Sequence, residues 1–321
     1  DAGLTGVVEW DGNSWIQLGN PIGGEAAGDK SGSAVSISSD GSRIAIGALY
    51  NDNANGSNAG HVRVYEWDGN SWGQVGQDID GLGDDDLSGR AVSMSSDGNR
   101  VAVGSPLASN YRGNVCIYDW NGTSWIPLGN PIIGEAPGDE SGYSVSISAN
   151  GNRVVIGAPR NDAVGSPAPG GAKGHVRVYN WNGTGWIKLG QDIDGESVGD
   201  FLGVSVSISA NGNRVATGAP QHDANILDEG HVRVYDWNGI SWVQVGQDLD
   251  GEARRDNSGH SVSFSSDGRC VAIGAIRNDA TSFSNADFGH VRVYRIDADS
   301  TIFINSCDSF FWSQNNTTYY S

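Results

Sequence analysis

One short segment returns through the whole chain, and this repetition limits the fold more than any other feature. GHVRVYEWDGNSW at 60–72 has related copies that begin at Gly113, Gly174, Gly230 and Gly289, and a shortened copy begins at Gly3. The first glycines of successive copies are 57, 53, 61, 56 and 59 residues apart. A period of that length, built only from strand-like segments, predicts an array of similar β units rather than one irregular domain.

Each repeat unit contains four strand signals. One unit reads SAVSIS at 33–38, an Asp-Gly pair, RIAIGA at 43–48, a variable loop, HVRVYEW at 61–67, a four-residue turn and WGQVGQDI at 72–79. The Asp-Gly pair, like the Asn-Gly pair in other units, tolerates positive φ and favours a tight hairpin. The first two strands carry Val and Ile on one face and Ser, Ala and Gly on the other. Such sheets are expected to stack with the large face of one against the small face of the next.

Four-stranded sheets stacked in this way around an axis form a β-propeller. The sequence therefore predicts an all-β protein with a single propeller domain over 1–321, whose repeat units start near residues 3, 60, 113, 174, 230 and 289. We expect six blades. The N-terminal strands at 6–10 and 15–19 would share the closing blade with strands at 309–313 and 317–321 of the non-repetitive tail, 298–321. Five or seven blades, and an all-β solenoid, are the alternatives.

The order of these motifs resembles the FG-GAP repeats of integrin α-subunit head propellers and of related secreted proteins. The pattern runs through residues 3–296, and GAP itself stands at 157–159 and 218–220. The resemblance implies a propeller with a binding role at the cell surface. The hairpins that carry D-x-D-x-D-G in calcium-binding members of the family read SSDGSR or SANGNR here, so the calcium site of that family is not implied.

The charge of the chain limits its partners. It has 19 basic and 38 acidic residues, which gives a net charge of −19. Such a surface repels nucleic acids and anionic lipid and attracts cations. No apolar stretch is long enough to cross a membrane as a helix. We therefore expect neither nucleic-acid binding nor membrane insertion.

Sequons and cysteines bear on the location of the protein. Sequons at Asn55, Asn121 and Asn182 indicate glycosylation, and hence an extracellular or cell-surface location. Cys270 and Cys116 stand where the other units have arginine in the second and the third strand. A disulfide between Cys270 and Cys307 is expected to fasten the tail to the last unit; the alternative is that all three thiols are unpaired.

Carboxylates gather in the loops that a propeller would present on one face. Oxygens at positions i, i+2, i+4 and i+8 of the loop after the fourth strand form candidate Ca²⁺ sites, and these residues are Asp192, Asp194, Glu196, Asp200, Asp248, Asp250, Glu252 and Asp256. Candidate binding-face residues follow the second strand, at Asp52, Asp162, Asp223 and Asp279. The alternative is that the recurring aspartates accept backbone hydrogen bonds within their own loops.

Aromatic and histidine side chains also recur with the repeat. Tryptophan pairs flank the hairpin between the third and fourth strands, at Trp67, Trp72, Trp120, Trp125, Trp181, Trp186, Trp237 and Trp242. They are interpreted as cross-strand contacts, with a rim of sugar-stacking platforms as the alternative. A histidine follows most anchor glycines and is expected to form hydrogen bonds at the strand start. His222 and His260 each occur once, and the sequence assigns them no partner.

Most of these residues repeat with the units, whereas an active site needs unlike residues that converge. The sequence therefore predicts that the protein is not an enzyme. The sequence favours an adhesion or scaffold module that binds an extracellular protein or glycan, and a larger assembly is compatible with this role. A lectin-like carbohydrate-binding module is the alternative, and a polysaccharide-active enzyme is a third hypothesis. Ca²⁺ is the one cofactor that the sequence suggests.

Overall fold

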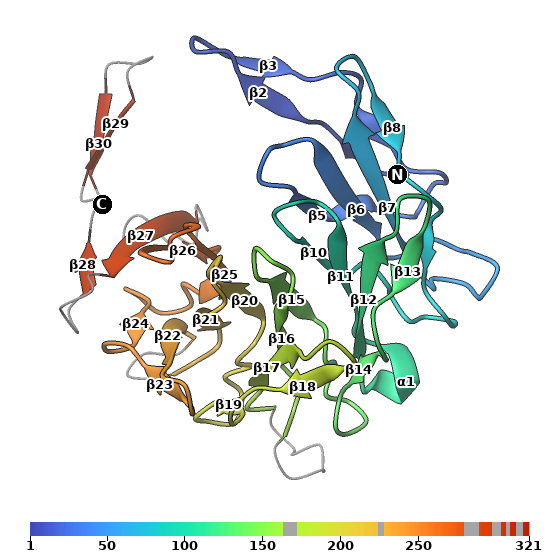
Figure 1. The fold of residues 1–321 in the computed structure, drawn as a ribbon. Coiled ribbons are helices and arrows are strands. Elements are labelled where there is room, and N and C mark those ends of the chain that lie inside the picture. Colours follow the sequence, from blue (N-terminus) through green and yellow to red (C-terminus); the bar gives the residue numbers. More distant parts are fainter. Residues whose placement is uncertain are drawn as a thin grey trace.

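The computed structural model describes residues 1–162, 172–223, 228–278 and 289–296, together with the strand backbones at 303–305, 309–312 and 317–320. Five antiparallel sheets, each with four strands paired in chain order, follow one another around an axis (Figure 1). The predicted all-β propeller is confirmed. No helix among the described residues has the length and the apolar character needed to span a membrane.

The five sheets are the blades of the propeller. The first blade contains β5 (Ser31–Ile37), β6 (Arg43–Ala48), β7 (His61–Trp67), β8 (Trp72–Gln74) and β9 (Ile79–Asp80). The second contains β10 (Ala91–Met94), β11 (Arg100–Ser105), β12 (Asn114–Trp120), β13 (Trp125–Pro127) and β14 (Ile132–Ile133), with the helical turn α1 (Ala108–Tyr111) between β11 and β12. The third contains β15 (Ser144–Ile147), β16 (Arg153–Ala158), β17 (His175–Trp181), β18 (Trp186–Lys188) and β19 (Ile193–Asp194). The fourth contains β20 (Ser205–Ile208), β21 (Arg214–Ala219), β22 (His231–Trp237), β23 (Trp242–Gln244) and β24 (Leu249–Asp250). The fifth contains β25 (Ser258–Phe264), β26 (Cys270–Ala275), β27 (His290–Ile296) and β28 (Phe303–Asn305).

The number of blades differs from the prediction. At the N-terminus, β1 (Leu4–Thr5) pairs with β4 (Ile22–Gly23) and β2 (Val8–Trp10) pairs with β3 (Trp15–Gln17). These are the outer strands of a blade without its inner pair. The tail strands β29 (Ser309–Trp312) and β30 (Thr317–Tyr320) form a two-stranded sheet of their own. The prediction of six blades with a shared closing blade is therefore wrong, and the alternative of five blades is correct. The tail, 298–321, contains no glycine, and so it lacks the residues with which inner strands approach a neighbouring blade.

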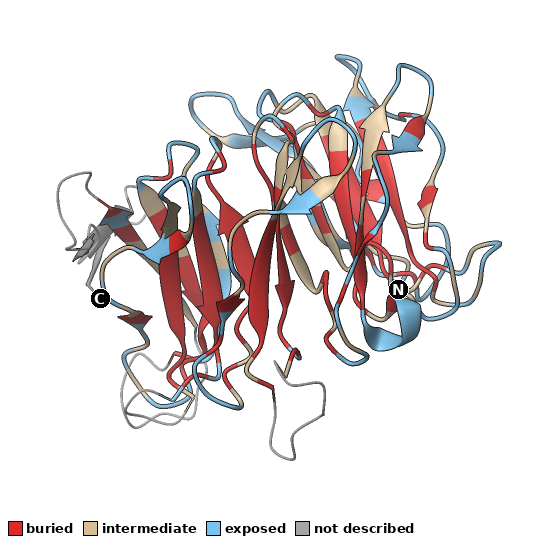
Figure 2. Ribbon diagram, turned by 60° about the horizontal axis from the view of Figure 1, so that its bottom comes forward, coloured by how far each residue is buried: buried red, intermediate tan, exposed pale blue. Residues whose placement is uncertain are grey.

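The hydrophobic core lies between the blades. Ala45, Val62 and Val64 of the first blade form one cluster with residues of the second blade that include Val101 and Val103. Equivalent clusters join the second blade to the third, the third to the fourth, and the fourth to the fifth. Figure 2 shows the buried residues along the strands and most exposed residues in the loops and hairpins at their ends. The predicted stacking of a large face on a small face is confirmed.

Two glycines in each repeat unit set the separation of neighbouring blades. A Cβ on Gly104 would lie 2.1 Å from the carbonyl oxygen of Gly142 in the next blade, which is far closer than any side chain allows. The same contact occurs at the three other interfaces, between Gly47 and Gly89, Gly157 and Gly203, and Gly218 and Gly259. The backbones of adjacent blades therefore touch at these points.

A serine hydroxyl on each first strand joins the same interfaces. The Met94 N–H donates a hydrogen bond of 3.0 Å to Ser36 Oγ in the preceding blade. The bond is repeated between Ile147 and Ser93, Ile208 and Ser146, and Phe264 and Ser207. Because the first strand is the inner edge of its sheet, these bonds satisfy backbone donors that have no strand partner.

We expect Gly104→Ala to lower the free energy of unfolding by about 1–3 kcal/mol, the usual cost of forcing extra volume into a packed interior. The added methyl group would push the second and third blades apart at the Gly142 carbonyl. Gly73→Ala is the matched control, because a Cβ on Gly73 meets no atom within 4 Å. Urea unfolding of both variants measures the difference. Equal midpoints would show that the glycine contact does not limit the packing of the blades.

Candidate functional site

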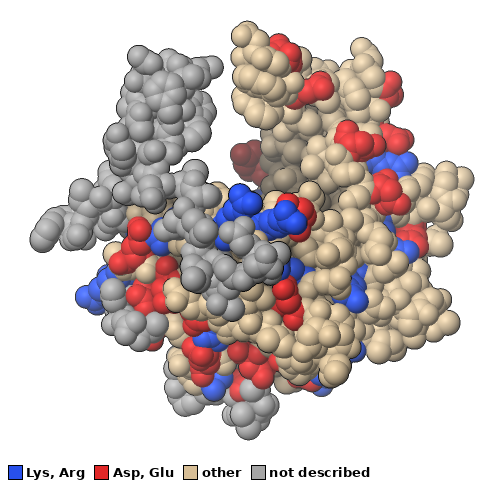
Figure 3. Space-filling model, turned by 60° about the vertical axis from the view of Figure 1, so that its left-hand side comes forward, with Lys and Arg blue, Asp and Glu red and all other residues tan. Residues whose placement is uncertain are grey.

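A charged unit repeats at the end of the blades where the long loops lie. In the third blade, Arg177 of β17 is only 7% exposed, and its Nη2 contacts Glu135 and lies 3.1 Å from Asp192 Oδ2. In the fourth blade, Nη2 of Arg233 lies 2.5 Å from Glu196 and 2.7 Å from Asp248. Each buried guanidinium thus holds two carboxylates that come from different loops. Figure 3 shows basic side chains lying against acidic ones on the side of the molecule that faces the viewer.

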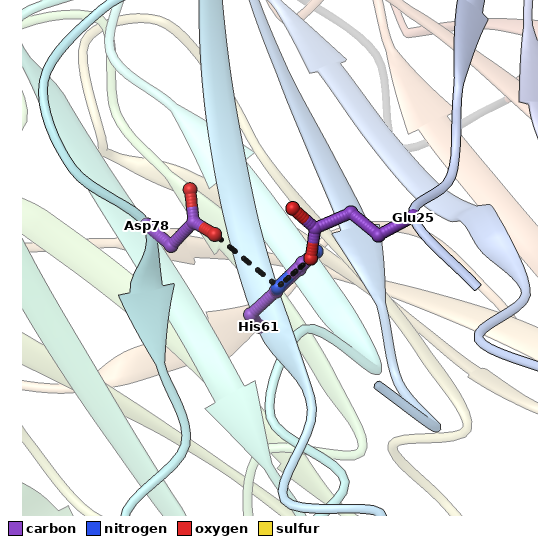
Figure 4. Close-up of side chains that lie close together, drawn as sticks. All are labelled: Glu25, His61 and Asp78. Atoms are coloured by element: carbon purple, nitrogen blue, oxygen red, sulfur yellow. Dashed lines mark ion pairs between the residues drawn. The ribbon is translucent and has the colours of Figure 1, made fainter. Parts of the chain in front are cut away.

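A buried histidine accompanies the charged unit, and the first blade shows it most simply. Nδ1 of His61 lies 3.9 Å from Glu25 and 3.8 Å from Asp78, which approach the imidazole from two loops (Figure 4). Nη1 of Arg63 lies 3.3 Å from the same glutamate. The donor atoms of Glu25, His61 and Asp78 all lie within 4.8 Å of one another, as do those of Glu135, His175 and Asp192 and those of His231, Asp248 and Asp250. These groups have the composition of metal ligands.

Burial and charge determine the protonation of this unit. Burial lowers the pKa of His61 and of His175, and the neighbouring arginine lowers it further. For His231 burial, His222 and Arg233 together lower the pKa to about 3. Burial alone would raise the pKa of Asp192, but hydrogen bonds from Lys188 and Arg177 outweigh it and hold the pKa below its usual value. These imidazoles are therefore neutral, and Asp192 is ionised.

The second blade lacks the whole unit. Leu82, Asn114, Cys116 and Pro131 stand where other blades have glutamate, histidine, arginine and aspartate. The N-terminal strands show the same joint loss, with Leu4, Gly6 and Pro21 at the last three of these positions. Joint loss is expected of an interacting set, because removing one charged partner leaves the others uncompensated. Sequence reasoning missed these arginines as site residues, although this joint replacement is a signal that could have found them.

The loop at 192–200 divides its candidate Ca²⁺ ligands between two blades. Asp192 pairs with Arg177 of the third blade, which the loop leaves, and Glu196 pairs with Arg233 of the fourth blade, which it enters. Asp200 accepts the backbone N–H of Ser197 within its own loop at 2.7 Å. Asp194 ends β19. The predicted series of carboxylates does not converge on one point.

The loop at 248–256 repeats this division. Asp248 pairs with Arg233, Glu252 pairs with Arg292 of the fifth blade, Asp256 accepts the N–H of Ala253 at 2.9 Å, and Asp250 ends β24. Aspartates at the position of Asp200 also bind their own loops in other blades: Asp29 accepts the N–H of Ala26, and Asp139 that of Ala136. The loop-capping alternative therefore describes these aspartates, and Ca²⁺ binding stays a prediction.

The carboxylates after the second strand lie apart from one another in their separate loops. Asp52 is exposed and accepts the N–H of Asn58 at 2.8 Å, and exposed Asp223 accepts the N–H of Asp228. Asp162 is half-buried, and Asp279 lies outside the described residues. Their role as a binding face stays a prediction.

The tryptophan pairs form the predicted cross-strand contacts. Ring centroids of the five pairs lie 5.3–5.6 Å apart. The second tryptophan of a pair also reaches the preceding blade, where Nε1 of Trp125 donates to the Val75 carbonyl at 2.9 Å and Nε1 of Trp242 donates to that of Leu189. The rings of Trp67, Trp72, Trp120, Trp125, Trp181, Trp186, Trp237 and Trp242 are all buried or half-buried. This placement favours a structural role over an open sugar-stacking platform.

The sequons and cysteines occupy distinct environments. Asn121 and Asn182 are exposed at hairpin tips, whereas Nδ2 of Asn55 donates to the Gly81 carbonyl at 2.8 Å. Cys270 begins β26 and is half-buried, while Cys307 lies outside the described residues. The predicted glycosylation and the predicted Cys270–Cys307 disulfide stay predictions.

The fourth blade departs from the repeat at His222. Asparagine stands at this position in three other blades, at Asn51, Asn161 and Asn278. The ring of His222 lies 4.0 Å from that of His231 between centroids, and its Nδ1 lies 3.1 Å from Asp200 Oδ2. Unlike residues thus converge at one place in an otherwise repetitive structure.

Residues 23–65 match the FG-GAP repeat family. The protein is a β-propeller that contains an FG-GAP repeat at 23–65. The matched segment covers β5, β6 and most of β7, and it includes Gly47, which contacts the next blade. No curated protein sequence matches the chain.

Two solved structures share the fold of this propeller. One is a protein assigned as a 6-phosphogluconolactonase from Bacteroides uniformis, with a TM-score of 0.52, 10% identity and 96% of each chain covered. The other is the periplasmic gluconolactonase of Pseudomonas aeruginosa, with a TM-score of 0.57 and 16% identity over 94% of this chain and 80% of that chain. At these identities the likeness shows the fold alone.

These two structures overturn the prediction that the protein is not an enzyme. That prediction rested on the argument that a ring of similar blades offers no converging set of unlike residues. Propellers of the same fold are described as lactonases, so repetition of blades is compatible with catalysis. The cluster at His222 shows the physical reason, because one substitution in one blade is enough to break the symmetry.

We expect Arg177→Cys to lower the free energy of unfolding by about 1–3 kcal/mol. This loss of stability is smaller than the one that follows the removal of one partner of a fully buried ion pair, because Glu135 is more than half exposed. The triple variant Glu135→Leu/Arg177→Cys/Asp192→Asn should recover at least half of the loss, since it removes the carboxylates together with their cation. Urea unfolding measures both. A triple variant less stable than the single one would show that the charges do not act as a set.

The buried histidines should make stability depend on pH. The unfolded chain protonates His175 below a pKa of about 6.5, whereas the folded pKa is lower. The unfolded state thus binds more protons, so the free energy of unfolding should fall as the pH drops below about 6.5, and the contribution of His175 should be constant above it. His175→Asn, which introduces the residue found at Asn114, should reduce this slope. Urea unfolding of the wild-type chain and of the variant at pH 7.5 and pH 5.5 tests this prediction. If the free energy of unfolding changes equally with pH in both, His175 is not a source of the pH dependence.

Proposed function

We propose that the protein is a secreted or cell-surface interaction module that binds a basic protein surface at the loop end of its blades. One observation carries this proposal: half-exposed glutamates recur at the same position in four of the five blades. Their side chains are 48%, 55%, 50% and 55% exposed at Glu25, Glu135, Glu196 and Glu252.

The arginines beneath these glutamates prepare them for binding. Arg63, Arg177 and Arg233 have side chains no more than 10% exposed, and each contacts its glutamate. The carboxylates are thereby held in one orientation before a partner arrives, and less side-chain freedom is lost on binding. In the fourth blade Arg233 also pairs with Asp248, so one cation faces two acids and that unit keeps a negative charge, whereas in the third blade Lys188 also pairs with Asp192.

The overall charge supports a basic partner. A net charge of −19 attracts a cationic surface at long range and raises the association rate. A basic protein surface is favoured over a glycan because the tryptophans pack between blades while the carboxylates are open to solvent. The exposed Asn121 and Asn182 sequons support an extracellular location. Ca²⁺ enters this proposal as a competitor for the same carboxylates.

Binding of a deca-lysine peptide tests the proposal. The double variant Glu135→Gln/Glu196→Gln should weaken the affinity for the peptide by about tenfold or more. A hydrogen bond to a charged group contributes about 1.5–3 kcal/mol, so the loss of one such contact already gives about a tenfold change. The matched control is Glu9→Gln/Glu66→Gln, which changes the net charge equally but lies at the opposite end of the third strands β2 and β7. Isothermal titration calorimetry at two salt concentrations, with and without Ca²⁺, measures the effect.

A specific site requires that the loop-end variant lose more affinity than the control. Equal losses in the two double variants would mean that the peptide responds only to net charge, and the proposal would fail. Binding that persists unchanged in the loop-end variant would also contradict it.

A further inference from the structure

The fourth blade contains two buried imidazoles where the first, third and fifth blades have one imidazole and one amide. In the first and fifth blades the amide donates to the loop aspartate: Nδ2 of Asn51 lies 3.2 Å from Asp29, and Nδ2 of Asn278 lies 2.9 Å from Asp256. His222 takes this place in the fourth blade. The fold therefore accepts either residue here, and the histidine is a change of chemistry.

Both imidazoles have unused nitrogens. His222 and His231 are 4% and 1% exposed, and neither Nδ1 makes a hydrogen bond. Nδ1 of His222 lies 3.1 Å from Asp200 Oδ2 without hydrogen-bond geometry, and Nδ1 of His231 lies 3.9 Å from Asp248 Oδ2. A buried nitrogen without a partner costs free energy. A bound cation would give both nitrogens a partner.

The charges around the imidazoles favour a cation. Asp200 and Glu196 lie beside His222, Asp248 and Asp250 have oxygens within 4.8 Å of a nitrogen of His231, and Arg233 is paired with Asp248 and Glu196. The carboxylates outnumber this guanidinium.

The donor atoms select the kind of cation. Imidazole nitrogen with carboxylate oxygen suits Zn²⁺ and related divalent transition metals, whereas Ca²⁺ takes oxygen ligands alone. Zinc–ligand bonds of about 2.0–2.2 Å place neighbouring ligand atoms about 3.4 Å apart in a tetrahedron. Nδ1 of His231 lies 3.9 Å from Asp248 Oδ2, and the donor atoms of His231, Asp248 and Asp250 all lie within 4.8 Å of one another, so small side-chain movements would bring them to that spacing.

We propose that the fourth blade binds one divalent transition-metal ion of the Zn²⁺ type. Its ligands are His231, Asp248 and Asp250, whose donor atoms lie within 4.8 Å of one another, and His222, whose ring lies 4.0 Å from that of His231. The proposed ligands do not include the glutamates of the proposed function, although Glu196 lies 3.9 Å from Nε2 of His222, and the site occurs in one blade. The first and third blades each hold a histidine between carboxylates but lack the second imidazole, so they should bind the ion far more weakly.

Competition between the chelated, metal-free protein and a chromogenic chelator for Zn²⁺ tests the proposal. The wild-type chain should bind one equivalent. His222→Asn and His231→Asn should each weaken Zn²⁺ binding by at least about 10–100-fold. A loss of that size follows the removal of a residue that only supports a metal ligand, and the removal of a ligand should cost at least as much. Both variants introduce residues that equivalent blade positions already contain, so they are expected to fold, and circular dichroism checks this. If His222→Asn does not fold, His231→Asn decides the result.

His175→Asn is the matched control, because it removes the equivalent histidine of the third blade. It should leave the affinity and the stoichiometry unchanged, and Co²⁺ in the wild-type site should show the visible absorption of a tetrahedral complex that His222→Asn lacks. Wild-type affinity in His222→Asn would overturn the proposal. So would an equal loss in the control, or displacement of Zn²⁺ by equimolar Ca²⁺.

Discussion

The contact between glycine backbones of neighbouring blades is the constraint on which the rest of the structure depends. Gly104 and Gly142 approach so closely that no side chain fits between them, and the same is true at the other interfaces between the five blades. This contact fixes how near two sheets can lie, and therefore which side chains fill the space beside it. The serine bonds such as that from Met94 to Ser36, and the apolar clusters, follow from that spacing. The two glycines of the repeat motif are thus partners of each other across an interface.

Because the contacts between blades are made by the strands, the ends of the blades can vary while the strands do not. The strands must satisfy the interface at every repeat, whereas the loops need only satisfy their own charges. The arginine unit shows the consequence, because it is complete in the third and fourth blades and replaced as a whole in the second. Its members change together since a buried guanidinium without a carboxylate, or the reverse, is costly.

The sequence predicted those features that depend on neighbours along the chain. Alternation of large and small residues in strands such as β6 located the sheets and their stacking. The blade number was wrong because it required strands at 309–313 and 317–321 to pair with distant partners, and spacing alone does not determine such pairing. The Ca²⁺ spacing suggested one centre because Asp192 and Glu196 are close in the sequence. In the structure their loop crosses from one blade to the next, so each of them faces a different arginine.

His222 shows why a site can be visible in the sequence and still lack an interpretation. As a single-copy residue it marked a break in the repeat, but its neighbours Asp200 and His231 come from two other segments. Repetition of blades gives each of them a fixed position, and one substitution then adds a second imidazole without disturbing the frame. A repeated scaffold can therefore form a site of unlike residues as an asymmetric fold does. One substitution is enough, provided that it lies where several loops already meet. The lactonases that share this fold are consistent with that view, and the fourth blade is where this chain makes such a departure.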